Sequence, residues 1–156
     1  MKAASLNELK QELMTLPPKK VLELCLRLAK SKKENKELLN FLLFEAHNEQ
    51  GYIESIKKEI NDSFWNLPRT NMYIIKKGLR KILKAIAKYS KYTSTKESEV
   101  EMLLSFCKNL NDSGIRFRSN KGSSNLYEQQ LKKLNLLIEQ VHEDLRFDYK
   151  KQLDQL

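Results

Sequence analysis

Glycine and proline are scarce in this chain of 156 residues, which has only 4 Gly and 3 Pro. These two residues punctuate turns and interrupt helices, so a low count leaves long stretches that can remain helical. The alternation of apolar and polar residues that is typical of a half-buried strand extends over no useful length. We therefore predict an all-α fold.

Cysteine is also scarce, with two residues, Cys25 and Cys107. Two cysteines in separate apolar runs do not make the framework of a disulfide-stabilised secreted domain. A cysteine inside an apolar helical run behaves as a small hydrophobic residue, so we expect both thiols to be buried and inert.

Long hydrophobic runs are missing as well. No stretch approaches the roughly 18 apolar residues that a membrane-spanning helix requires. The first ten residues lack the apolar centre of a secretory signal. A cytoplasmic location is therefore expected.

Sequence motifs of common enzyme classes are absent, including glycine-rich phosphate loops, H-E-x-x-H and C-x-x-C. We expect neither an enzyme nor a bound cofactor, although an enzyme without a recognisable motif remains an alternative. Glu139 and His142 have the spacing seen in di-metal helical bundles, which need a second such pair. The only other histidine, His47, has Phe44 where the glutamate should stand, so we expect no metal site.

Apolar spacing and capping patterns predict seven helices. The S-x-x-E pattern of a helix start occurs at Ser5, Ser31 and Ser94, and Asn48 and Asn125 are further candidate caps. Gly114 is expected to end the sixth helix. The expected helices span about 6–16, 18–30, 31–46, 49–65, 69–92, 95–110 and 126–153.

Short connections between these helices favour antiparallel neighbours in a single domain covering residues 1–156. Grouping as 5–30, 33–65 and 69–110 also fits a short helical-hairpin, solenoid-like array, and an irregular bundle is the alternative. The helices over 18–30 and 31–46 are apolar over a broad arc, which predicts that they form the centre of the N-terminal half.

The basic residues are distributed unevenly. The chain has 29 basic and 20 acidic residues, and the net charge is +1 over residues 1–66, +8 over 67–92 and 0 over 93–156. Nearly the whole excess therefore falls on the expected helix at 69–92. Its positions at 100° per residue separate an apolar stripe from a basic one. We call the basic one the cationic face, and it consists of Tyr73, Lys76, Lys77, Arg80, Lys81, Lys84, Lys88 and Lys91.

Like charges four residues apart on this helix destabilise it by about 0.2–0.5 kcal/mol per pair. An anionic partner would compensate for that cost. An acidic protein surface is the partner we favour; nucleic acid and an anionic membrane surface are alternatives. The remaining alternative is a solvated face that acids of the flanking helices partly neutralise. The 23 Lys against 6 Arg argue against sequence-specific reading of bases.

Residues 111–125 form the longest expected irregular stretch. Loops of this length in a small domain are functional or disordered. The stretch could be an incidental connector, or a second binding element in which an aromatic ring stacks on a base. Its candidate residues are Arg116, Phe117, Arg118 and Lys121.

Overall fold

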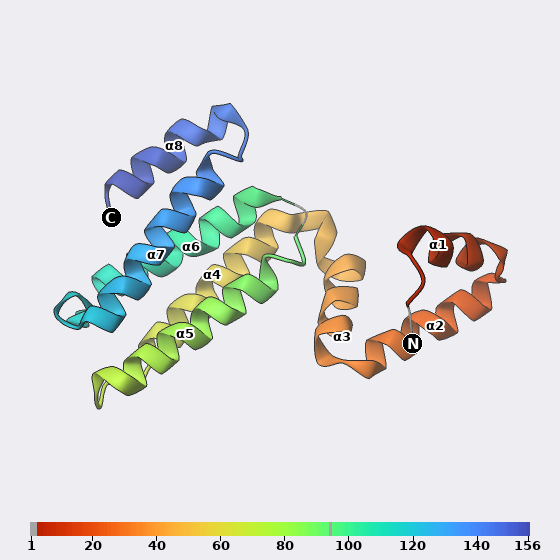
Figure 1. The fold of residues 1–156 in the computed structure, drawn as a ribbon, viewed down its shortest axis with the longest axis horizontal. Coiled ribbons are helices and arrows are strands. Elements are labelled where there is room, and N and C mark those ends of the chain that lie inside the picture. Colours follow the sequence, from red (N-terminus) through yellow and green to blue (C-terminus); the bar gives the residue numbers. More distant parts are fainter. Residues whose placement is uncertain (1–2, 94) are drawn as a thin grey trace. The chain divides into compact units, whose positions relative to one another are not determined.

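The computed structural model describes residues 3–93 and 95–156, and this part of the chain is all-α, as predicted (Figure 1). The helices are α1 (Leu6–Thr15), α2 (Pro18–Ser31), α3 (Lys33–Asn40), α4 (Glu49–Trp65), α5 (Met72–Tyr89), α6 (Lys96–Asp112), α7 (Lys121–Ile138) and α8 (Glu143–Asp154). No described helix is long and apolar enough to cross a membrane.

Contacts divide the chain into two units, residues 1–44 and 45–156. The prediction of one domain over 1–156 stays a prediction. In the first unit, Ser5 and Glu8 form the expected capping box at the start of α1. Proline at the first position of α2 suits a helix start, because no backbone N–H is needed there.

The first unit lacks the buried centre that its sequence predicts. No residue of α1, α2 or α3 is buried, and Leu22 and Leu26 are 58% and 46% exposed. The expectation that the helices over 18–30 and 31–46 form a core is therefore wrong for α2 and α3; of that predicted pair only Phe41, just after α3, is buried, at 4% exposure. Although α2 and α3 pack against each other, short helices in this unit provide no opposing layer that could cover a broad apolar arc.

A helix boundary in this unit also differs from the prediction. Ser31 does not cap α3, because it is the last residue of α2 and its hydroxyl donates to the carbonyl of Leu28 (2.7 Å). Lys32 occupies the cap position without a side-chain bond. The α-helical part of the helix predicted over 31–46 ends at Asn40. A π-helical turn, Phe41–Glu45, follows it.

The second unit is built around α6, which packs against α4, α5, α7 and α8. A helix with four neighbours must be apolar around most of its circumference. Accordingly its buried apolar residues lie on several sides of the helix: Val100, Met102, Leu103, Leu104, Phe106, Cys107 and Leu110. Asn48 caps α4 as predicted, because its side chain accepts from the N–H of Gly51 (3.0 Å). The predicted cap Ser94 lies outside the described residues, and Thr95 precedes α6.

In the C-terminal third, helix begins earlier than predicted, and two helices, α7 and α8, replace the single predicted one. Gly114 has a φ of +71°, the left-handed conformation expected where α6 ends. The loop is shorter than 111–125 because Asn120, rather than Asn125, caps α7. The single helix expected over 126–153 is interrupted between α7 and α8. The Arg146 side chain donates to the carbonyls of Glu139 and Val141, which the end of α7 leaves without helical partners.

Candidate cationic docking surface

Helix α5 presents the cationic face because its other side is anchored in the core. Its first turn is capped by the Asn71 side chain, which accepts from the N–H of Ile74 (2.9 Å). The core residues recur every three or four positions, so all of them fall on one side of the helix. They are Ile75, Leu79, Ile82 and Ile86, each at most 6% exposed.

The cationic face lies opposite these residues, as the helical periodicity predicts. Tyr73 is 78% exposed. Lys76 and Lys88 are half-buried, and Lys91 follows the end of the helix. The exposed cations are Lys77, Arg80, Lys81, Lys84 and Lys91.

Neighbouring acids do not neutralise most of this face. Within residues 3–93 and 95–156, six of its cations make no ion pair: Lys76, Lys77, Arg80, Lys81, Lys84 and Lys91. Several acids of α4 and α6 are engaged elsewhere. Glu101 pairs with Lys57 (2.6 Å), and Glu99 pairs with Lys133 (2.5 Å). Glu59 accepts from the hydroxyl of Tyr89 (2.9 Å).

The second candidate binding element, within residues 111–125, does not present its aromatic ring to a partner. Phe117 is 2% exposed and packs on Tyr127, with ring centroids 4.9 Å apart. The Arg118 guanidinium covers the Phe117 ring at 4.8 Å and donates to the side chain of Asn111 (3.0 Å). The expectation that Phe117 could stack on a base is therefore wrong for this conformation, because its ring belongs to the core.

The start of α7 lies beside the cationic face. A methyl group at Gly122 would clash with the ammonium end of Lys76, so that side chain reaches the first turn of α7. Lys121, the first residue of α7, is exposed there, and the first turn of α7 contains no acid. Arg116 is exposed in the preceding connection. The structure thus brings Lys121 near the cationic face, a proximity that the sequence does not predict.

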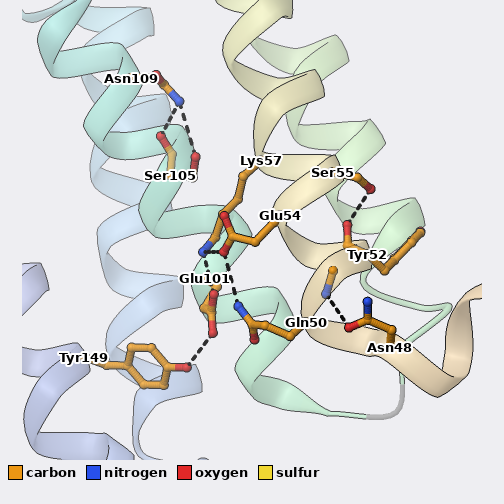
Figure 2. Close-up of polar contacts among 11 residues, drawn as sticks. Asn48, Gln50, Tyr52, Glu54, Ser55, Lys57, Glu101, Ser105, Asn109 and Tyr149 are labelled. Carbon is orange, nitrogen blue, oxygen red and sulfur yellow. Dashed lines mark hydrogen bonds and ion pairs between the residues drawn. The ribbon is translucent and has the colours of Figure 1, made fainter.

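A polar cluster that sequence reasoning missed links α4, α6 and α8 (Figure 2). The Lys57 ammonium lies between Glu101 (2.6 Å) and Glu54 (2.8 Å), and the Tyr149 hydroxyl donates to Glu101 (3.2 Å). Only the Glu54–Lys57 pair, three residues apart, could have been expected from the sequence. The other two contacts join residues more than forty positions apart.

Charges within this cluster stabilise one another. Burial would lower the pKa of Lys57, but its bonds with Glu101 and Glu54 outweigh burial and raise that pKa. Burial, followed by the charge of Glu101, raises the pKa of Tyr149. Lys57 therefore remains an ammonium and Tyr149 a neutral phenol near neutral pH. The adjoining groove of about 550 Å³ also includes Lys108, Asn111 and Gln152.

Glu139 and His142 make contacts within the protein at the connection between α7 and α8. Glu139 lies 2.6 Å from the ammonium of Lys150, and His142 caps α8 by accepting from the N–H of Asp144 (3.3 Å). Both side chains therefore stabilise the connection between α7 and α8.

Comparison with protein-family models, with curated proteins and with solved structures found no match.

The like charges on α5 predict that selected reversals will stabilise the protein. Replacing Lys77 and Lys84 together with glutamate converts three repulsive i,i+4 pairs into attractive ones. We expect the free energy of unfolding at low salt to rise by about 1 kcal/mol or more. Urea unfolding followed by circular dichroism would measure it.

The matched control replaces Lys58 and Lys132 with glutamate. It changes the net charge equally but places glutamate four residues from Asp62 and Glu128. This control should be slightly destabilised. Equal stabilisation of both variants would attribute the gain to net charge and contradict a specific cost at the cationic face.

Proposed function

We propose that this chain is a non-enzymatic, cytoplasmic binding module that docks an acidic protein surface on the cationic face of α5. The observation that carries the proposal is a set of six cations, five on α5 and Lys91 just after it, that have no ion-pair partner in the described part of the chain. Retaining several like charges side by side costs helix stability. A complementary anionic surface would remove that cost and would accelerate association.

The test compares two fourfold charge reversals in the full chain. In the first, Lys77, Lys81, Lys84 and Lys88 become glutamate; in the control, Lys58, Lys108, Lys132 and Lys151 do. The probe is a fluorescein-labelled, glutamate-rich peptide of about 18 residues, which spans about 27 Å when helical and so matches the face. Fluorescence anisotropy would measure its affinity.

We expect the first variant to bind the peptide at least about tenfold more weakly, because exposed ion pairs contribute about 0.2–1 kcal/mol each. The control should stay within about threefold of the wild type. Equal loss in both variants would show that net charge alone attracts the peptide. Unchanged binding by the first variant would remove the cationic face from the function.

Nucleic acid is the second candidate partner, and exposed Tyr73 within the cationic face is the observation that favours it. Bases stack on exposed aromatic rings while lysines contact the phosphates. Such binding should weaken log-linearly with salt, with a slope near −0.9 per phosphate contact on duplex DNA. A gel-shift assay with no DNA or RNA binding at low salt would exclude this candidate.

A further inference from the structure

Two large aromatic rings are exposed at the connection between α4 and α5. Trp65 is the last residue of α4 and is 76% exposed; Tyr73, in the first turn of α5, is 78% exposed. Neither ring makes a hydrogen bond or ring contact within the described part of the chain. Each lies close in sequence to a core residue, Phe64 and Ile75, so the exposure does not come from a poorly packed segment.

One residue of the connection between these rings, Leu67, is buried in the core, whereas the others are exposed. Leu67 is 8% exposed and fills the space that a side chain at position 78 would need, because a methyl group on Gly78 would clash with it. This core contact reduces the conformational freedom that the connection would lose when a partner binds. The exposed rings are therefore suited to act as anchors, and tryptophan and tyrosine are enriched among the residues that dominate binding energy.

Cations surround this end of α5. Arg69 is exposed in the connection, and Lys76 and Lys77 follow Tyr73 by about one turn. Lys121 at the start of α7 lies nearby, since Lys76 reaches Gly122. Figure 1 shows the α4–α5 and α6–α7 connections at the same end of the second unit.

The opposite end of the cationic face offers no comparable anchor. The Tyr89 hydroxyl donates to Glu59 (2.9 Å), and the ammonium of Lys88 lies 4.4 Å from the centre of the Tyr89 ring. This tyrosine is engaged within the protein. The face is therefore asymmetric, with aromatic anchors beside cations at the start of α5 and lysines alone toward its end.

From this asymmetry, and resting on the proposed function, we infer that the partner is an acidic segment with apolar residues clustered at one end. The apolar end contacts Trp65 and Tyr73, and the acidic run extends along α5 toward Lys91. Charge complementarity brings the segment to the face, whereas burial of the two rings supplies selectivity and sets the direction in which the segment lies.

The experiment uses two labelled peptides of about 18 residues, long enough to match the face. Both carry the same glutamates; one has leucine and phenylalanine at one end, and the other has serine at those positions. At about 0.15 M salt, where exposed charges are well screened, we expect the apolar-ended peptide to bind at least about tenfold more tightly. Because Trp65 is the only tryptophan, its emission should also shift to shorter wavelength with this peptide alone.

Alanine variants then show which side chains cause the preference for the apolar-ended peptide. Trp65→Ala and Tyr73→Ala should each reduce the preference for the apolar-ended peptide to about threefold or less. Phe147→Ala is the matched control, because Phe147 is 73% exposed on α8 and should leave the preference intact. A preference that survives both aromatic replacements would overturn the inference.

The outcomes also separate this inference from the proposed function. Equal binding of the two peptides would overturn the inference and leave the acidic-partner function standing. Binding of neither peptide would overturn both. Tight binding of a single-stranded oligothymidine that quenches Trp65, without peptide binding, would replace both with a stacking site for nucleic acid.

Discussion

Replacing Phe106 with alanine is expected to lower the free energy of unfolding of residues 45–156 by about 3–5 kcal/mol. Phe106 lies on α6, is 0% exposed and packs on Phe64 with ring centroids 5.4 Å apart. Loss of the ring would leave a large cavity in the core where α6 packs against its neighbours, which are α4, α5, α7 and α8. Few neighbours could move to fill it without losing contacts of their own.

The same substitution at an exposed phenylalanine provides the control. Phe147→Ala on α8, where the ring is 73% exposed, should change the free energy of unfolding by less than about 0.5 kcal/mol. Urea unfolding followed by far-ultraviolet circular dichroism and by Trp65 fluorescence would measure both. A similar cost for the two variants would contradict the placement of α6 at the centre of this unit.

The two thiols are expected to differ by orders of magnitude in their rate of modification. Cys107 is 0% exposed, and burial raises its pKa to about 12. At about pH 8 its thiolate fraction is then about a thousandfold below that of an ordinary cysteine, and thiolate is the reactive form. Cys25 is exposed, which corrects the expectation that both thiols are buried.

A thiol-disulfide reagent that produces a coloured product would measure this difference. We expect one thiol per chain to react promptly in the native protein and the second only on unfolding in urea. Cys25→Ser should abolish the fast reaction, whereas Cys107→Ala should leave it unchanged. Two fast thiols in the wild type would contradict the burial of Cys107.

The raised pKa of Cys107 also determines the sign of a pH effect. Below about pH 8.5 the thiol is neutral in both folded and unfolded chains, so its contribution to stability is fully present. At higher pH the unfolded chain loses this proton first, and stability falls until pH approaches about 12. The loss, measured as the difference between wild type and Cys107→Ala, should approach about 1.4 kcal/mol per pH unit.

Helix type, several helix limits and the two-sided character of α5 could be predicted because they depend on neighbours along the chain. The predicted bounds of α4 match its limits, since Asn48 supplies the cap and Leu67-Pro68 follows its end. Capping residues were harder to choose. Ser31 and Asn125 match capping patterns, yet the residue at the N-cap of α3 is Lys32 and the residue at the N-cap of α7 is Asn120. Several side chains near a helix start can bond the backbone, and tertiary packing decides which one does.

The sequence by itself determined the helical class, the concentration of charge on residues 67–92 and the opposition of that charge to an apolar stripe. These properties follow from composition and from a period of 3.6 residues, and both are local. Tertiary structure alone decided which apolar stripes are covered: Phe117 and Cys107 are buried, whereas Leu22 and Cys25 are exposed. It also decided that Glu101 pairs with Lys57 and so does not neutralise α5. Burial and ion pairing depend on residues distant in the chain, and local periodicity contains no information about them.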